Sequence, residues 1–567
     1  MTGRQRRRSH QLVLCAILGL GLLTAGPGPA RADDLLFFGG PIHTGRDDRP
    51  QVEAVLVAGE RIAFAGNLAA ARARMAEGTH EIDLKGAALF PGFTDSHAHL
   101  YGIGLRELTL NLEGTASIAE LRDRVAEAAA KAAPGAVIVG RGWIETHWPE
   151  ARFPNRHDLD AVVSDRPVIL TRADGHALVA NSRALARAGI TRDTEPPFGG
   201  DILKDADGEP TGMIIDAAMG LLAPLLRAAE EVDPHRVYEA ANRVYTARGW
   251  TGIHSMSVDP ARLDLIEALA DAGVLKLRIY NSVDRKGAGA LFESGPRASK
   301  NGRVTTRAIK LYMDGALGSR GAALLAPYSD APKTAGLLQM KKADTMPLLQ
   351  QALERGIQVN THAIGDRGNR LVLDWYAEAF ASVPEDARAV ASPRWRIEHA
   401  QILDPADIPR FAQLGVIASM QPSHAISDLY FAPARLGPDR LAGAYAWHSL
   451  VDSGAVIAAG SDAPVERGDP LIEFYAAVAR RSLDGFSGPG WHPGQAVDRA
   501  TALRMLTLWP AYARFAERDL GTIAAGKLAD LTVFSGDLMT LPVAEIPRQK
   551  ALMTVIGGAI VYRADGF

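Results

Sequence analysis

The stretch Phe90–Leu100, FPGFTDSHAHL, places two histidines two residues apart at the end of an apolar segment. In a strand, residues i and i+2 point to the same side, so His97 and His99 are expected to face one cavity together. Such a pair suits metal binding, although hydrogen-bonded core histidines would show the same spacing. Asp95 precedes them, and we expect its carboxylate to orient one of the imidazoles.

Seven more short apolar or β-branched runs follow this stretch: WTGIHSMS, LKLRIYNSV, RAIKLYMDG, IQVNTHAIG, RWRIEHAQ, GVIASMQP and AVIAAGSDAP. Helical stretches such as ADTMPLLQQALERG separate most of them, and this alternation indicates parallel β/α units. Together with the first stretch they make eight strands. We therefore predict an α/β fold, a (β/α)8 TIM barrel.

The remaining segments predict three additions to this barrel. Residues 33–90 and 516–567 are rich in short β-type runs and glycine turns, which predicts one composite β-sandwich built from both termini. The barrel then spans residues 91–515. Residues from about 105 to 235 do not fit the strand count and include a hairpin, FGGDILKDADGEPTGMI, so we expect an insertion after barrel strand 1.

Polar residues stand at or near the ends of four later strands: His362, His399, Asp462 and, inside its strand, Lys310. The carboxyl ends of barrel strands meet at one face, where active sites of this fold are built. Convergence of these groups with the first two histidines predicts a metal site. The alternative is a set of unrelated core and surface residues.

Six sequence segments, most of them around the predicted ligands, carry a specific resemblance: FPGFTDSHAHL, KLYMDGALGSR, NTHAIGDRGN, RIEHAQ, GSDAPV and GTIAAGKLADL. The chain resembles the amidohydrolase superfamily, and within it the N-substituted formamide deformylase-like branch of metal-dependent hydrolases. The likeness spans nearly all of the chain after residue 32. It implies an enzyme that cleaves an amide-type C–N bond in an N-substituted formamide, an amide or a cyclic amide.

The resemblance also implies roles for the strand-end residues. His97 and His99 would hold one divalent ion, His362 and His399 a second, and zinc suits these ligands. Lys310 would carry a CO2-derived carbamate that bridges the ions. Asp462 would contact a metal and act as general acid and base for a hydroxide that bridges the metals.

Two of these roles have structural alternatives. Lys310 could form a plain ion pair, for instance with Asp314. Asp462 could cap the N-terminus of a helix, since Ser461-Asp462-Ala463-Pro464 is a typical opening.

Five residues are candidates for the wall of the substrate pocket, and for each an ordinary core or surface role is the alternative: His176, Trp143, Glu145, Arg320 and His424. The first three belong to the insertion, which we expect to cover the end of the barrel.

Two rival functions remain open. A mononuclear deaminase of the same fold would share most of the ligands, but it typically has a glutamate three residues after the fifth-strand histidine. Gly365 occupies that position here, and such enzymes lack the bridging lysine. A non-catalytic exported binding or regulatory protein would be expected to have lost a ligand, and none is missing.

The N-terminus predicts export. A basic start precedes a 15-residue apolar run and the sequence Ala30-Arg31-Ala32, which is typical of a signal peptide (residues 1–32) rather than a stable membrane anchor. Export through the general or the twin-arginine route would deliver a periplasmic or secreted protein. Its only cysteine, Cys15, would be removed, so neither a disulfide nor a thiolate ligand is expected.

The charge and composition of the chain limit the classes of partner that it is expected to bind. After cleavage, 57 basic residues face 65 acidic ones, a balance that does not suit a nucleic-acid binder. We expect a small-molecule substrate as partner, and a homodimer is left open.

Overall fold

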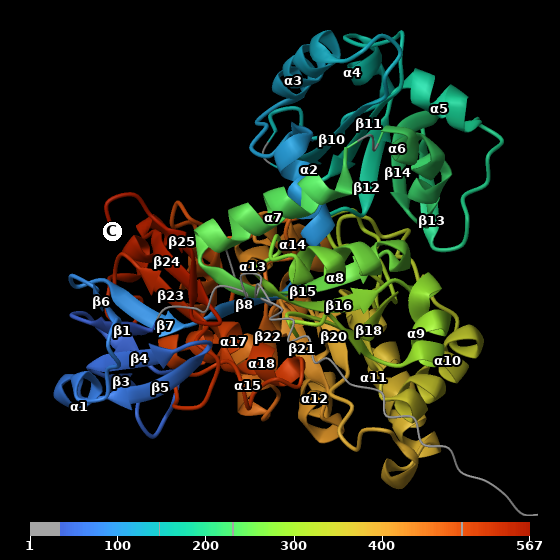
Figure 1. Cartoon of the computed structure of the whole chain (residues 1–567). Helices are drawn as coiled ribbons and strands as arrows, with labels where there is room; N and C mark the ends of the chain where they lie inside the picture. Colours follow the sequence, from blue (N-terminus) through green and yellow to red (C-terminus); the bar gives the residue numbers. More distant parts are fainter. Residues whose placement is uncertain (1–33, 147, 230–231, 489–490) are drawn as a thin grey trace, which may run out of the picture.

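The computed structural model describes residues 34–146, 148–229, 232–488 and 491–567. Its central feature is a nine-stranded sheet, in which eight strands follow the order β22-β21-β20-β19-β18-β16-β15-β8 with every neighbouring pair parallel, while the short β17 (Arg297–Ala298) pairs antiparallel with β18. The eight predicted runs supply these strands: β8 (Phe93–Ala98), β15 (Trp250–Val258), β16 (Arg278–Val283), β18 (Val304–Tyr312), β19 (Gln358–Ala363), β20 (Arg396–His399), β21 (Ile417–Met420) and β22 (Ile457–Ala459). The prediction of a (β/α)8 barrel is confirmed (Figure 1).

The barrel is nearly closed where β22 meets β8. Beyond the last strand, the N–H of Asp462 donates to the carbonyl of His97 at 2.6 Å, and the N–H of His99 donates to the carbonyl of Ala463 at 2.8 Å. Gly460 permits this approach, because a Cβ there would lie 2.4 Å from the backbone nitrogen of His97. The first and last strands are therefore joined at the end that carries the predicted ligands.

Helices surround the barrel and share its core. The helix before the fifth strand, α10 (Lys342–Arg355), buries Leu349, Ala352 and Leu353 and ends at Gly356, whose φ of +65° allows the left-handed cap. Others with the same role are α8 (Leu263–Asp271), α11 (Asp366–Ser382), α12 (Ile408–Leu414), α15 (Trp447–Asp452), α16 (Pro470–Ala479), α17 (Arg499–Leu506) and α18 (Leu508–Ala513).

A six-stranded sheet lies between β8 and β15 in the sequence and forms the upper lobe in Figure 1. Its order is β13-β14-β12-β11-β10-β9, with β9 (Leu110–Asn111), β10 (Ile138–Trp143), β11 (Val168–Arg172), β12 (Ala177–Ala180), β13 (Gly200–Lys204) and β14 (Pro210–Asp216). Helices α3 (Ile118–Lys131), α4 (Arg156–Asp160), α5 (Ser182–Ala188) and α6 (Ala223–Ala229) pack on it around two cores of its own. We call this lobe the insertion.

The chain leaves and re-enters the barrel through two helices that pack on each other. They are α2 (Leu100–Leu108) and α7 (Pro234–Arg248). Gly104 makes the contact close, since a Cβ there would lie 1.9 Å from the carbonyl oxygen of Val237.

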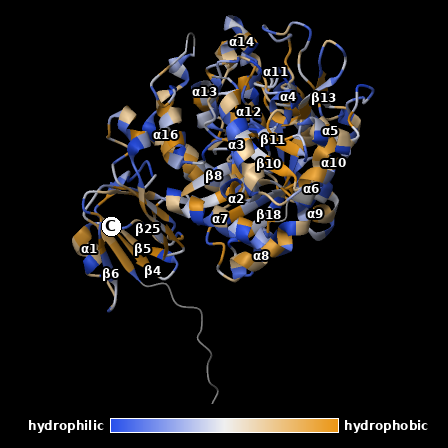
Figure 2. Ribbon diagram, turned by 90° about the horizontal axis from the view of Figure 1, so that it is seen from above, coloured by the Kyte–Doolittle hydropathy of each residue, from blue (hydrophilic) through white to orange (hydrophobic). Residues whose placement is uncertain are grey.

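Segments from both termini form two further sheets. One has the order β5-β4-β1-β6 and the other β25-β24-β23-β7-β2-β3, in which β23 (Leu531–Phe534) pairs antiparallel with β7 (Ala88–Pro91). The remaining strands are β1 (Leu35–Phe38), β2 (Ile42–His43), β3 (Gln51–Val52), β4 (Ala54–Ala58), β5 (Arg61–Gly66), β6 (His80–Asp83), β24 (Ala551–Ile556) and β25 (Ala559–Arg563). Leu35, Val57, Leu89 and Val533 belong to one buried cluster that draws on both sheets. Figure 2 shows these strands as a largely hydrophobic group.

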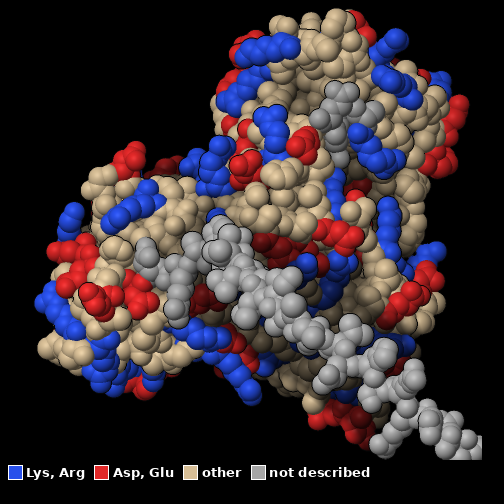
Figure 3. Space-filling view, viewed as in Figure 1, with Lys and Arg blue, Asp and Glu red and all other residues tan. Residues whose placement is uncertain are grey.

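Basic and acidic side chains are interspersed on the face shown in Figure 3. Among the helices of the described residues, none combines the length and the apolar character that crossing a membrane requires. The predicted signal peptide, residues 1–32, and Cys15 lie outside the described residues.

Candidate metal centre

His97, His99 and Asp462 meet where the barrel closes. The Nε2 atoms of His97 and His99 lie 3.5 and 3.1 Å from Oδ1 of Asp462. This oxygen is buried, yet it has no aligned hydrogen-bond partner among the described residues. His97, His399 and Asp462 also offer three ligand atoms that lie within 4.8 Å of one another.

Hydrogen bonds assign the ring nitrogens that face the cavity. Nδ1 of His97 lies 2.6 Å from Oε2 of Glu398, Nδ1 of His99 lies 3.2 Å from the carbonyl of Met256, and Nδ1 of His399 lies 2.8 Å from Oε1 of Gln421. Because each acceptor needs a proton from Nδ1, the lone pair of each ring is on Nε2. Burial, and next the charge of Lys310, hold the pKa of His97 well below its usual value. The imidazole is therefore neutral and able to bind a cation.

His362 is oriented the other way round. Its Nε2 lies 3.3 Å from the carbonyl of Gly315 and 3.4 Å from Oδ1 of Asp314, which leaves Nδ1 as the lone-pair nitrogen. Its ring centroid is 4.6 Å from that of His399. Asp314 itself accepts backbone N–H groups from Ala323, Ile364 and Gly365, and burial raises its pKa to about 7.

Lys310 extends from β18 into the same cluster. It is buried, and its Nζ lies 3.2 Å from Nε2 of His97. Burial lowers the pKa of Lys310 to about 8, although the charges of Glu398 and Asp462 act in the opposite direction. No ion pair with Asp314 forms among the described residues, so the alternative of a plain salt bridge to Asp314 is wrong.

Asp462 lies in a turn and not at the start of a helix, so the helix-cap alternative is also wrong. The next helix, α16, begins at Pro470, and Asp469 caps it. Asp462 has a φ of +58°, a conformation that is unusual for a residue other than glycine. Burial would raise its pKa, but the approach of His99 and the charges of His424 and Lys310 lower it below the usual value.

The insertion contributes His176 to the barrel site. Its Nδ1 lies 2.5 Å from Oδ1 of Asp216 at the end of β14, and its ring centroid is 4.9 Å from that of His362. Asp216 fits against two glycines of the loop after β18, since a Cβ on Gly315 or Gly321 would lie 2.2 or 2.4 Å from its Oδ2. This contact anchors the insertion over the end of the barrel.

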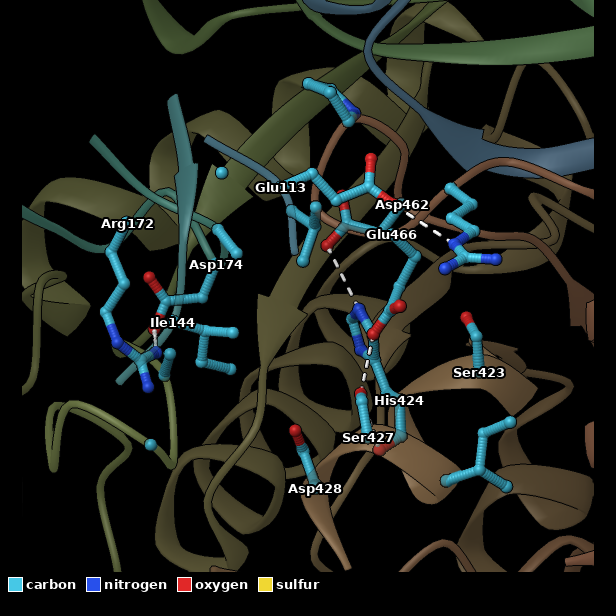
Figure 4. Close-up of a pocket in the computed structure, with 18 of the residues that line it drawn as sticks. Glu113, Ile144, Arg172, Asp174, Ser423, His424, Ser427, Asp428, Asp462 and Glu466 are labelled. Carbon is cyan, nitrogen blue, oxygen red and sulfur yellow. Dashed lines mark hydrogen bonds and ion pairs between the residues drawn. The ribbon is translucent and has the colours of Figure 1, made fainter. Parts of the chain in front are cut away.

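A cavity adjoins the cluster and is lined by barrel and insertion together. Figure 4 shows Asp462, Glu466 and His424 turned toward one another on one side, with Arg172 and Asp174 on the other. His424 Nε2 lies 3.7 Å from Oδ2 of Asp462. Burial raises the pKa of Glu466 to about 7, although the hydroxyl of Ser427 donates to it at 2.6 Å. His176 and His424 thus line this cavity.

Three other predicted wall residues are placed elsewhere, and the pocket-wall assignment is wrong for them. Trp143 is buried in the core of the insertion, where its Nε1–H donates to Leu170. Glu145 forms an ion pair with Arg172 behind the wall at 2.8 Å. Arg320 forms an ion pair with Asp330 away from the cavity at 2.8 Å.

Asp95 also differs from the expectation, because it orients backbone and not an imidazole. Its carboxylate accepts the N–H groups of Ser461 and His97 at 2.9 and 3.2 Å and the hydroxyl groups of Ser461 and Tyr245 at 2.6 and 3.0 Å. Glu398 performs the expected task instead. Its position directly before His399 in the buried strand RIEH was the available signal for it.

The donor set fits a divalent metal site. Neutral imidazole nitrogens and carboxylate oxygen are ligands that zinc and related ions prefer. The lone-pair nitrogens of His97 and His99 face the unpaired oxygen of Asp462 without an aligned hydrogen bond, an arrangement that a shared cation would stabilise.

Comparison with known proteins finds similar proteins that cover most of the chain. Residues 80–562 match the family model described as "Amidohydrolase family". The chain is 35% identical to the amidohydrolase YtcJ of Bacillus subtilis over 93% of this chain and 99% of that protein. It is 28% identical to the N-substituted formamide deformylase of Arthrobacter pascens over 94% and 99%. A crystal structure of a metal-dependent hydrolase from Pyrococcus horikoshii OT3 superposes with a TM-score of 0.72 and 27% identity, covering 90% of this chain and 99% of that one.

Proposed function

Because this chain belongs to the amidohydrolase family and is a hydrolytic enzyme acting on C–N bonds, we propose that it is a binuclear metal hydrolase of N-substituted formamides or related amides. One observation carries the proposal. Six potential ligands from four barrel strands and the segment after a fifth converge at one end of the barrel, and Lys310 lies among the imidazoles at 3.2 Å from His97.

The ligands divide into two groups. His97 and His99 would hold one ion through Nε2, and His362 and His399 the other through Nδ1 and Nε2. Lys310 would serve both ions as a carbamate: its neutral amine adds to CO2, an N–C bond forms, one proton is lost, and two oxygens become available as ligands. The buried setting that lowers the pKa of Lys310 to about 8 favours the neutral amine that this step requires.

The chemistry follows from the position of Asp462. Bound divalent ions would polarise the amide carbonyl and lower the pKa of a water molecule. Asp462, ionised because its pKa is lowered, accepts the proton of the attacking water as the C–O bond forms. It then delivers that proton to the nitrogen as the C–N bond breaks, which releases an amine and a carboxylic acid.

Two further features belong to the proposal. The sheets built from both termini would form one composite sandwich beside the barrel, since they share a buried cluster. Export would follow from the signal-like residues 1–32, and the mature enzyme would act in the periplasm or outside the cell.

The metal content of the protein and its hydrolysis of formamides and amides test the proposed function. We expect about two ions per chain by elemental mass spectrometry, and hydrolysis of N-benzylformamide or a similar formamide that a chelator abolishes and zinc restores. One ion per chain at saturation would contradict the binuclear assignment. A protein that holds its metal ions and hydrolyses none of the formamides and amides tested would contradict the substrate class.

A further inference from the structure

A β-bulge in the insertion directs one arginine toward the cavity. In β10 the pairing with β11 shifts between Arg141 and Trp143, and Gly142 has a φ of +111° that favours glycine. Without the bulge, Arg141 and Trp143 would point to the same face, because they are two residues apart. With it, Trp143 enters the core of the insertion and Arg141 lines the cavity beside Asp462 and His399.

Arg141 differs from the other arginines of this cavity in having no carboxylate partner. Arg106 lies 3.2 Å from Glu107, Arg172 lies 2.8 Å from Glu145, and Arg467 lies 3.1 Å from Glu113. Within the described part of the chain, Arg141 forms no ion pair, and its buried Nε has no hydrogen-bond partner. Of its five N–H donors, one is used, in a bond from an Nη atom to the carbonyl of Ala173 at 3.0 Å.

The guanidinium of Arg141 is accessible from two adjoining cavities next to the predicted metal centre. Arg141 lines the cavity that holds Glu466 and His424 and also the adjoining one that holds His97, Lys310 and His362. Gly175 gives it room, since a Cβ there would lie 3.1 Å from an Nη atom. Asp174, which lines the same cavity, is already bound by Arg172. Burial lowers the pKa of Arg141, the charges of Asp462 and Asp174 act in the opposite direction, and the guanidinium stays a cation.

We infer that Arg141 binds a carboxylate of the substrate, so that the preferred compounds are N-acyl or N-formyl derivatives that carry an acid group, such as N-acylated amino acids. A half-buried guanidinium whose Nε is buried without a partner is costly until an anion completes it. Its planar fork matches a carboxylate through two parallel N–H···O bonds. The inference rests on the proposed amide hydrolysis and adds the substrate class to it.

Matched substrates separate this role from a structural one. The zinc-loaded enzyme and its Arg141→Gln and Arg141→Lys variants would be assayed on N-formyl amino acids and on the corresponding N-formyl amino acid amides. We expect Arg141→Gln to raise KM for the acids about 10- to 100-fold and to change kcat/KM for the neutral amides less than about threefold. Arg141→Lys, which keeps the charge without the fork, should give an intermediate KM.

Arg467→Gln is the matched control, since Arg467 borders the same cavity but is exposed and paired with Glu113. It should leave the acid-to-amide ratio of the enzyme unchanged. Equal losses on acids and amides in Arg141→Gln, with unchanged metal content, would overturn the inference while leaving the hydrolase assignment intact.

A binding readout covers the case in which no tested amide is cleaved. Phenylacetate should raise the melting temperature of the zinc-loaded protein more than phenylacetamide does, and Arg141→Gln should remove that difference. Equal shifts by the two compounds, or a difference that persists in Arg141→Gln, would overturn carboxylate binding whatever the reaction.

Discussion

Nδ1 of His97 and Oε2 of Glu398 lie 2.6 Å apart in the interior of the barrel, although 301 positions separate the two residues in the sequence. Both side chains are fully buried, and burial raises the pKa of Glu398 while it lowers that of His97. The bond joins the first strand of the barrel to the sixth. It fixes the imidazole with Nε2 toward the predicted metal.

Glu398→Gln should weaken metal binding while the fold remains. An amide of the same shape can still accept from Nδ1, but it removes the negative charge that makes the imidazole a better ligand, so we expect a metal affinity about 10- to 100-fold lower. Chelator titration followed by elemental mass spectrometry measures this. Glu517→Gln, which removes a carboxylate that pairs with Arg394 far from the site, is the control. Equal metal retention in both variants would show that Glu398 does not support the ligand.

Asp462→Asn should reduce kcat about 10²- to 10⁴-fold on any amide that the enzyme cleaves, because the amide cannot accept and return the proton. Circular dichroism and the melting temperature should stay close to those of the parent enzyme, since the backbone bond from Asp462 to His97 is kept. Asp404→Asn, at a helix start on the surface, should leave kcat unchanged. Normal turnover by Asp462→Asn would eliminate Asp462 as the general base.

At a fixed concentration of dissolved CO2, bicarbonate buffer should reactivate enzyme that has been stripped of metal and CO2, and it should do so faster as the pH rises through about 8. The neutral amine of Lys310 is the reactive form, and with a pKa lowered to about 8 its share grows from roughly a tenth at pH 7 to roughly nine tenths at pH 9. Activity recovered after addition of zinc, with and without bicarbonate, measures the effect. Recovery that is independent of bicarbonate at every pH would contradict the carbamate.

Two glycine-to-alanine substitutions should have opposite effects on stability. Gly460→Ala places a Cβ 2.4 Å from the backbone nitrogen of His97 and 2.6 Å from Oδ1 of Asp95, so the closure of the barrel must shift, at a cost of about 1–3 kcal/mol. In Gly289→Ala the new methyl meets nothing within 4 Å and lies in helix α9 (Ala288–Ser294), where we expect a gain of about 0.4–1 kcal/mol. Chemical denaturation measures both. A Gly460→Ala protein as stable as its parent would contradict the tight closure.

Local sequence patterns were sufficient to predict the barrel strands and the polar groups at their ends. Alternation with a period of two and the position after an apolar run are both local properties, and they brought His97, His362, His399 and Asp462 to one place. The partners that orient these groups depend on distant registers. Nothing near His97 in the sequence points to Glu398, and nothing near His176 points to Asp216 across the insertion.

The error at Trp143 has a specific physical cause. Trp143 was expected at the pocket wall, but the bulge at Gly142 moves it into the core and presents Arg141 to the cavity instead. A bulge changes which face each residue occupies without changing the composition of the strand. The sequence GRGWI therefore identified the right segment and the wrong side chain.

The packing of α2 against α7 has a consequence for how such an enzyme can diversify. Because the lobe begins and ends at two helices in contact, its chain ends are already held together, and exchanging the lobe would add little loop-closure entropy to the folding of the barrel. The predicted ligands all come from the barrel, while Arg141 and His176 come from the lobe. A laboratory library that swaps residues between Thr109 and Asp233 could thus change substrate preference and leave the hydrolytic centre in place.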